Sequence, residues 1–224
     1  MARHTLSYAD RIFRGGTHYG KYQGGLRGLE VSDLFWVYFG AVEATDADGV
    51  AESQAVDEGE LFTLDGDLVT DGVAEFDVPR NVVAAWTGTA VLTVTGTDEY
   101  GETVVESSAS GTSFAGKKAF KTVTAVTVSA NVTSATVGTG KVLGLPFRIN
   151  SKGQVIVVSE DGKAETASVV LAGDDDTATA TTGDVRGTVA VAGTPDGTKA
   201  YSVLMGRNAG SGKVVQFGVA QFGG

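Results

Sequence analysis

The chain contains no cysteine and only two histidines, and these absences narrow the chemistry open to it. Without cysteine it forms no disulfide bond and offers no thiolate to a metal or a substrate. His4 and His18 both lie in a glycine-rich N-terminal segment, which gives a histidine-based catalytic triad or zinc site no rigid scaffold. The sequence therefore predicts a protein that is not an enzyme and that uses no cofactor or catalytic metal.

Long hydrophobic runs are also lacking. The longest apolar segments are only a few residues, whereas a membrane-spanning helix needs about 20. Residues 1–14 contain no apolar stretch of the kind found in a secretory signal peptide. We therefore expect a chain made in a cytoplasm, with no membrane partner.

Proline is scarce, with 3 residues, whereas glycine is abundant, with 32. Together with many valine, threonine and alanine residues, this composition favours strands and tight turns over helices. About a dozen short apolar segments separated by turn residues are typical of a sandwich or a barrel. We expect an all-β fold: an antiparallel β-sandwich or jelly-roll-like body with an extended N-terminal arm.

Charge divides the chain into three blocks. Residues 1–29 carry five Lys or Arg and one carboxylate, for a net charge of +4, and residues 30–106 carry eighteen carboxylates and one Arg, for −17. Residues 107–224 carry eleven basic and eight acidic groups, for +3. We therefore separate an arm, residues 1–29, from a β-rich body, residues 30–224. The Ser/Gly-rich segment 107–116, where the charge changes sign, is a candidate linker or subdomain boundary.

The arm interleaves basic and aromatic residues with glycines and shows no helical period. It cannot bury enough apolar surface alone to offset its ordering entropy, so it is either a frayed terminus or a segment that a partner orders. A nucleic acid is not the expected partner, because the acidic body would repel a phosphate backbone. The residues predicted to contact the partner are Arg3, Tyr8, Arg11, Phe13, Arg14, Tyr19, Lys21, Tyr22 and Arg27.

Apolar runs and turn residues predict individual strands in the body. The aromatic run 34–39 predicts a buried strand. Residues 97–101 and 160–163 predict the turns of two hairpins. Segment 120–129 predicts a strand with a β-bulge, because its apolar phase slips near Ala125. Further strands are expected at residues 80–86, 90–96, 142–147, 154–159, 168–171, 187–192, 200–205 and 213–217.

The acidic stretch 43–77 contains Asp-Gly turn signals, and its carboxylates are expected to face water. Clustered carboxylates in the body could hold a calcium ion or serve a glycosidase, but none has the full spacing of a calcium-binding loop. A solvated surface is the preferred interpretation. The clusters are Asp46 and Asp48; Asp65, Asp67 and Asp71; and Asp174, Asp175 and Asp176.

Three glycine-rich segments approach known motifs without matching them. Residues 206–213 are close to a phosphate-binding loop, but the first glycine is out of register and Val214 stands where a Ser or Thr is needed. Residues 138–144 lack the spacing of the dinucleotide fingerprint, and residues 111–115 lack the second glycine of a nucleophile elbow. None of the three indicates an enzyme.

Strand and turn phrases of the body are similar to those of a known class of proteins. The phrases are Thr97-Asp98-Glu99-Tyr100-Gly101 and residues 116–129, 137–147, 182–188 and 195–199. Together they resemble the small auxiliary structural proteins of tailed-bacteriophage virions, the decoration or cement class that coats the head. The resemblance spans roughly residues 90 to 199 and covers neither the arm nor residues 206–224.

The resemblance implies a non-enzymatic virion protein on the outer surface of the capsid. Its partner would be the major capsid protein of the phage head, and its role would be to stabilise the assembled shell. Cement proteins commonly gather around local threefold axes, so the resemblance also implies a homotrimer. The arm would then be the segment that lies across the shell.

Two other functions stay open. The chain could be a tail, baseplate or fibre-associated β structural protein, which its copy number in the particle would reveal. It could also be a carbohydrate-binding adhesion module, because exposed Trp or Tyr side chains on a sandwich can stack on sugars. Trp36 and Trp86 both lie in apolar segments, so we expect both to pack in the core.

Overall fold

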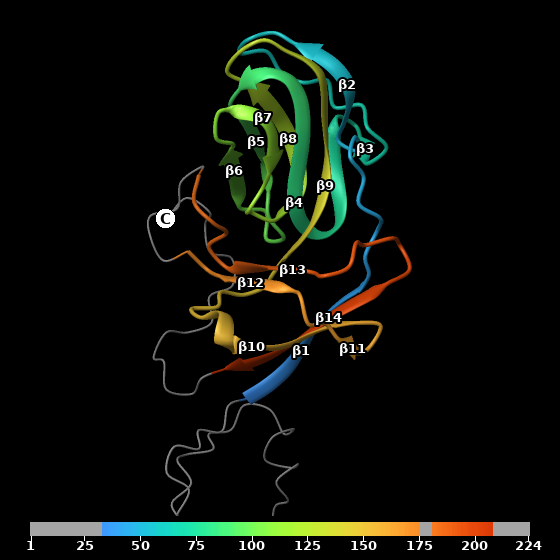
Figure 1. The fold of residues 1–224 in the computed structure, drawn as a ribbon, viewed down its shortest axis with the longest axis vertical. Helices are drawn as coiled ribbons and strands as arrows, with labels where there is room; N and C mark the ends of the chain where they lie inside the picture. Colours follow the sequence, from blue (N-terminus) through green and yellow to red (C-terminus); the bar gives the residue numbers. More distant parts are fainter. Residues whose placement is uncertain (1–32, 175–180, 208–224) are drawn as a thin grey trace, which may run out of the picture.

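The computed structural model describes residues 33–174 and 181–207 of the chain. These residues form fourteen strands and one short 3-10 helix, η1 (Lys152–Gln154), and their strand pairings are all antiparallel. The predicted all-β fold is therefore confirmed. Figure 1 shows a larger group of strands above a smaller one along the long axis of the molecule.

The upper group belongs to one curled sheet of ten strands, of which β12 and β13 lie lower, towards the smaller group (Figure 1). Its strands are β2 (Ala51–Val56), β3 (Val69–Thr70), β4 (Val73–Ala90), β5 (Leu92–Thr97), β6 (Thr103–Ser107), β7 (Gly111–Ala115), β8 (Phe120–Val128), β9 (Val132–Gly144), β12 (Val169–Ala172) and β13 (Gly187–Ala190). Seven of them follow the order β12-β13-β9-β4-β8-β5-β6, while β2 pairs with β9, and β3 and β7 pair with β4.

Strand β4 is the centre of this sheet. It is 18 residues long and pairs with β9, β8 and β7 along its length. The sequence predicted a strand only over residues 80–86, whereas the structure extends it at both ends. The extension has a packing cause, since Phe76, Val82 and Trp86 all face the same hydrophobic cluster.

A smaller, four-stranded sheet follows the order β1-β14-β10-β11. Its strands are β1 (Asp33–Ala41), β10 (Val155–Glu160), β11 (Lys163–Ala164) and β14 (Ala200–Arg207). Among the described residues β1 pairs only with β14, and Asp33 stands opposite Arg207 in that pair. The chain segments before β1 and after β14 therefore join the body at the same end of this sheet (Figure 1).

The core consists of two hydrophobic clusters. The larger one lies inside the ten-stranded sheet and includes Phe120 and Val137. The smaller one is covered by the four-stranded sheet and includes Leu143 and Tyr201. Strand β9 contributes to both clusters, with Val137 in the larger one and Leu143 in the smaller one.

Segment 107–116 is not a linker, contrary to the prediction from its composition. Residues Gly111–Ala115 form β7, and Phe114 pairs with Ala84 of β4. Phe114 is buried in the larger cluster, whereas Thr112 and Ser113 of the same strand are exposed. A short strand with one buried apolar side chain has the composition of a loop, which is why the sequence was misread.

The predicted hairpin turns are confirmed. Residues between Thr97 and Thr103, which pair with each other, join β5 to β6. Asp161 and Gly162 join β10 to β11 with φ angles of 50° and 75°. Positive φ at both central positions is the geometry of a type I′ turn, whose twist matches that of the flanking strands.

The predicted β-bulge in β8 is also present. Thr95 of β5 stands opposite Ala125, and the next residue, Gly96, stands opposite Val123. Thr124 is therefore the extra residue, one position from the predicted slip. The irregular position lets β8 keep its apolar side chains in the larger cluster on both sides of the bulge.

The acidic stretch faces water, as predicted. Eleven of the twelve Asp and Glu residues between positions 43 and 77 are exposed. The nearest basic residue along the chain, Arg80, is buried, and its Nη1 atom lies 3.5 Å from Asp77 Oδ1. We call the exposed carboxylates of residues 43–77 the acidic surface. The segment 43–77 contains no Lys or Arg that could neutralise them.

Candidate functional site

The arm predicted to contact a partner lies outside the described residues. This applies to Arg3, Tyr8, Arg11, Phe13, Arg14, Tyr19, Lys21, Tyr22 and Arg27, and also to the strand predicted at residues 213–217. Their roles stay predictions. The described part of the body begins at Asp33, which is the first residue of the edge strand β1.

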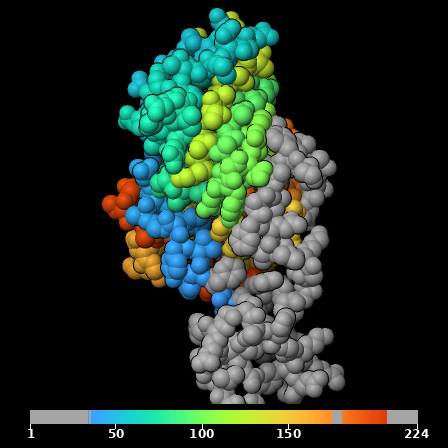
Figure 2. Space-filling view, turned by 180° about the vertical axis from the view of Figure 1, so that it is seen from behind, coloured from blue at the N-terminus to red at the C-terminus, as the bar shows by residue number. Residues whose placement is uncertain are grey.

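Strand β1 carries two exposed aromatic side chains. Trp36 is 44% exposed and Tyr38 is 74% exposed, and their ring centroids lie 6.0 Å apart with planes inclined by 23°. Figure 2 shows the blue segment that begins with β1 at the molecular surface, below the cyan and green atoms of the larger sheet. We call Trp36 and Tyr38 the aromatic pair.

The predictions that segment 34–39 is a buried strand and that Trp36 packs in the core were wrong, because Trp36 and Tyr38 are exposed. The strand exists, but only one of its faces meets the smaller cluster, through Val37 and Phe39. An edge strand over one core must alternate between core and solvent. The sequence hides this alternation because both faces carry apolar residues. Trp86, in contrast, is buried as predicted.

A hollow of about 290 Å³ lies beside the aromatic pair, where β1 approaches the larger sheet. Tyr38 lines it from β1, Asp77 from β4, Lys121 from β8 and Glu99 from the β5–β6 turn. Asp77 Oδ2 accepts a hydrogen bond of 2.8 Å from the Glu43 backbone N–H. The hollow therefore brings together an aromatic ring, two carboxylates and an ammonium group from four separate segments.

The position of Lys121 is fixed by backbone contacts. Its Nζ atom donates to the Phe76 carbonyl oxygen and, at 3.3 Å, to the Asp77 carbonyl oxygen. It also lies 3.6 Å from Glu75 Oε1, an exposed pair that contributes little stability. The carbonyls hold the ammonium group at the wall of the hollow.

A buried ion pair fixes the turn that carries Glu99. Asp98 Oδ2 lies 2.5 Å from Arg186 Nη1, and both side chains are almost fully buried. Asp98 Oδ1 also accepts hydrogen bonds from the backbone N–H groups of Tyr100 and Glu102. The contact between Asp98 and Arg186 spans 88 residues of sequence and ties the β5–β6 turn to the segment before β13.

Tyr100 extends this contact. Its ring lies over the Arg186 guanidinium, 5.3 Å from the ring centroid to Cζ, and its hydroxyl donates to the Pro146 carbonyl oxygen. Arg186 Nε donates in turn to the Leu145 carbonyl oxygen. Burial raises the pKa of the Tyr100 hydroxyl. The turn is thus packed against the chain that follows β9, next to the hollow.

A second group of buried polar contacts surrounds Glu106 and connects the β6–β8 region to residues 181–186. Its carboxylate accepts hydrogen bonds from the backbone N–H groups of Lys117 and Lys118, at 2.5 and 3.0 Å. Lys118 Nζ donates to the Gly183 carbonyl oxygen at 3.2 Å, and Asp184 accepts from the Ala119 N–H at 3.0 Å. These contacts fasten residues 181–186 to the β6–β8 region.

Burial controls the ionisation of these groups. Loss of hydration raises the pKa of Glu106 to about 7, although the two N–H donors and the neighbouring lysines oppose the rise. Loss of hydration also lowers the pKa of Lys118, against the attraction of Asp184 and Glu106. Burial therefore disfavours the charged form of both side chains.

We expect Glu106 to make stability fall as the pH rises from about 4.5 to about 7. Within this window the folded chain keeps a proton that the unfolded chain releases, so its stabilising contribution is complete below about 4.5 and lost near 7. The loss is at most about 3 kcal/mol. Urea denaturation across the window measures it.

Glu106→Gln is the matched control, because glutamine keeps an acceptor oxygen and does not titrate. Its free energy of unfolding should change less across the same pH window than that of the natural chain. An unchanged pH dependence in the variant would assign the effect to other groups.

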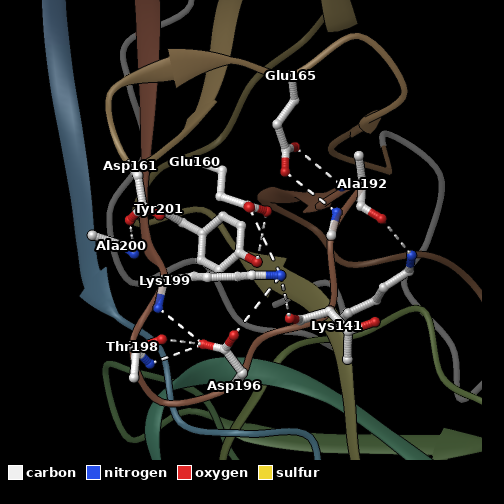
Figure 3. Close-up of polar contacts among 12 residues, drawn as sticks. Lys141, Glu160, Asp161, Glu165, Ala192, Asp196, Thr198, Lys199, Ala200 and Tyr201 are labelled. Carbon is white, nitrogen blue, oxygen red and sulfur yellow. Dashed lines mark hydrogen bonds and ion pairs between the residues drawn. The ribbon is translucent and has the colours of Figure 1, made fainter.

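A third polar cluster lies at the end of the smaller sheet (Figure 3). The Tyr201 hydroxyl donates to Glu160 Oε2 at 3.2 Å, and Lys199 Nζ lies 3.7 Å from Glu160 Oε1 and 3.8 Å from Asp196 Oδ2. Glu165 accepts from the Ala192 N–H at 3.0 Å. Burial, and then the nearby Glu160 carboxylate, raise the pKa of Tyr201. The cluster fastens the loop before β14 to the β10–β11 hairpin.

The carboxylate clusters considered for calcium do not form a metal site in the part of the chain that the structure describes. There, no three His, Cys, Asp or Glu side chains are placed to hold an ion. Asp175 and Asp176 lie outside the described residues. Within the described ranges, no helix is long and apolar enough to cross a membrane.

In the comparison with known proteins, no family model, no curated protein and no solved structure matches this chain.

Proposed function

We propose that this chain is a non-enzymatic structural protein of a tailed-phage virion, which binds the outer surface of the assembled capsid and stabilises it as a decoration or cement protein. Its partner is the major capsid protein, and its working form is a homotrimer. The proposal rests on the resemblance of residues 90–199 to that class and on the division of charge between arm and body.

The division of charge is the observation that carries the proposal. The arm has a net charge of +4, whereas the body displays the acidic surface of residues 43–77. Acidic bodies repel one another in solution, and a basic aromatic arm is attracted to an acidic shell. A protein that binds the assembled shell but not the dissociated subunits stabilises the assembled state by mass action.

The arm can supply much of the contact that such binding needs. A specific interface buries about 1,000 Å² or more. An extended segment reaches about 3.3 Å per residue, so the arm can contact the shell along a long path. Because the arm's side of the chain enters the body at the end of edge strand β1, the arm can lie on the shell without crossing the body's own core.

Removing residues 1–29 should abolish binding to capsids that lack the protein. A full-length variant with Arg3, Arg11, Arg14, Lys21 and Arg27 changed to Glu should lose binding equally, because only the charge of the arm differs. Co-sedimentation with purified capsids measures both, and circular dichroism checks that the body stays folded. Undiminished binding of both variants would contradict the role of the arm.

Copy number separates this proposal from a role in the tail. A head protein is present in hundreds of copies per particle, whereas a tail or baseplate protein is present in a few tens or fewer. Quantitative proteomics of purified particles therefore decides between the two sites.

A further inference from the structure

The aromatic pair and the hollow beside it have no role in the proposed function. Trp36 and Tyr38 expose their rings although the chain could place polar residues on this face of β1, as it does on β2. Exposed aromatic rings beside a concave site are typical of ligand contact, because such rings lose unfavourable hydration when a ligand covers them.

Apart from Tyr38, the walls of the hollow are mostly apolar, and its three charged side chains are Asp77, Glu99 and Lys121. Glu99 lies on a turn fixed by the buried Asp98–Arg186 pair, and Lys121 Nζ is held by two carbonyl oxygens. Glu99 itself makes no hydrogen bond or ion pair with another described residue, and it is exposed. A carboxylate on a fixed turn and an ammonium held at the wall can accept from and donate to the hydroxyl groups of one ligand.

We propose that this hollow binds a neutral saccharide, with a sugar ring on Tyr38 and hydroxyl groups hydrogen-bonded to Glu99 and Lys121. A sugar ring has an apolar C–H face and a rim of hydroxyls, which matches an aromatic ring beside charged hydrogen-bonding groups. A broad protein partner would need an extended apolar surface, whereas here the ring of Tyr38 borders a small hollow that also holds charged groups.

Charge selects the class of saccharide. Asp77 and Glu99 contribute two carboxylates to the hollow, and Lys121 contributes the one ammonium among its described lining residues. The acidic surface continues outward from Asp77. Sugars that carry carboxylate or sulfate groups would therefore be repelled, and neutral hexoses or N-acetylhexosamines would be preferred.

Many copies on one particle would make a weak site effective. Binding of several sites to one polymer multiplies the affinity well beyond that of a single site. The proposal does not depend on attachment to the capsid, since it concerns the body and not the arm.

The test uses the purified full-length chain and a panel of neutral gluco-, galacto- and manno-oligosaccharides and N-acetylglucosamine oligomers, with hyaluronate as an anionic comparison. Saturation-transfer NMR and calorimetry should detect binding of at least one neutral sugar and none of hyaluronate. Tyr38→Ala and Glu99→Gln should each weaken that binding by about tenfold or more.

Ile156→Ala is the matched control, because Ile156 is exposed to 52% on the same sheet and does not line the hollow. It should leave sugar binding unchanged, and thermal melting should show that all variants are folded. No binding of any neutral sugar, or equal binding by the Tyr38 and Glu99 variants, would overturn the proposal. So would loss of capsid binding in Tyr38→Ala without any sugar binding, which would make the aromatic pair a protein contact.

Discussion

Asp98→Ala should destabilise the folded chain by about 3–5 kcal/mol, the largest effect we expect of any single substitution. The change leaves the Arg186 guanidinium buried without its carboxylate and leaves the N–H groups of Tyr100 and Glu102 without an acceptor. An uncompensated buried charge is costly because the interior hydrates it poorly. Urea or thermal denaturation of the purified variant measures the loss.

The double variant Asp98→Ala/Arg186→Met separates the buried charge from the lost packing. Removing the guanidinium as well should restore part of the stability, because no unpaired charge remains. If the single variant were as stable as the natural chain, the ion pair would not hold the β5–β6 turn against the segment before β13.

Gly138→Ala should cost more than about 3 kcal/mol, at the upper end of overpacking effects. A Cβ atom at this position of β9 would overlap the Asp46 carbonyl oxygen and would lie 2.5 Å from the Ala47 carbonyl carbon. These are backbone atoms, and the Thr139 N–H donates to the same Asp46 oxygen at 2.6 Å. The loop before β2 would have to leave β9, so both the melting temperature and the yield of folded protein should fall.

Gly111→Ala is the control for this substitution. Gly111 also lies in a strand, but a Cβ there would meet only the Ala109 oxygen, at 4.0 Å. Its stability should stay within about 0.5 kcal/mol of the natural chain. Similar losses in the two variants would show that the cost comes from glycine replacement in general and not from the close approach at Gly138.

Features that depend on neighbouring residues could be predicted from the sequence. The Asp161–Gly162 turn follows from the ability of these residues to take positive φ angles, and the bulge in β8 follows from a slip in its apolar phase. The exposure of the acidic stretch follows from the cost of burying unpaired carboxylates.

Features that depend on distant pairing could not be predicted. The strand β7 has the composition of a loop and is defined only by its pairing with β4. The exposure of Trp36 depends on β1 lying at a sheet edge, which the apolar run does not reveal. The junction between the two clusters falls inside β9, where no change of composition marks it.

The candidate sites show the same limit. The arm was predicted from its charge and aromatic content, and it lies outside the described residues, so it stays a prediction. The buried pair of Asp98 and Arg186 and the contacts of Glu106 with Lys118 were missed. Asp98 and Arg186 are 88 residues apart, and nothing in either local sequence marks it as the other's partner. The hollow was missed because its walls come from five separate segments of the chain.

The most direct test of the account is the stoichiometry of this chain in purified particles, relative to the major capsid protein, before and after mild heating or chaotrope treatment. The account predicts about one copy per shell subunit or one per three, with heads that become fragile once the chain is removed. A ratio of a few per cent would place the protein in the tail, and absence from particles would contradict the proposed function.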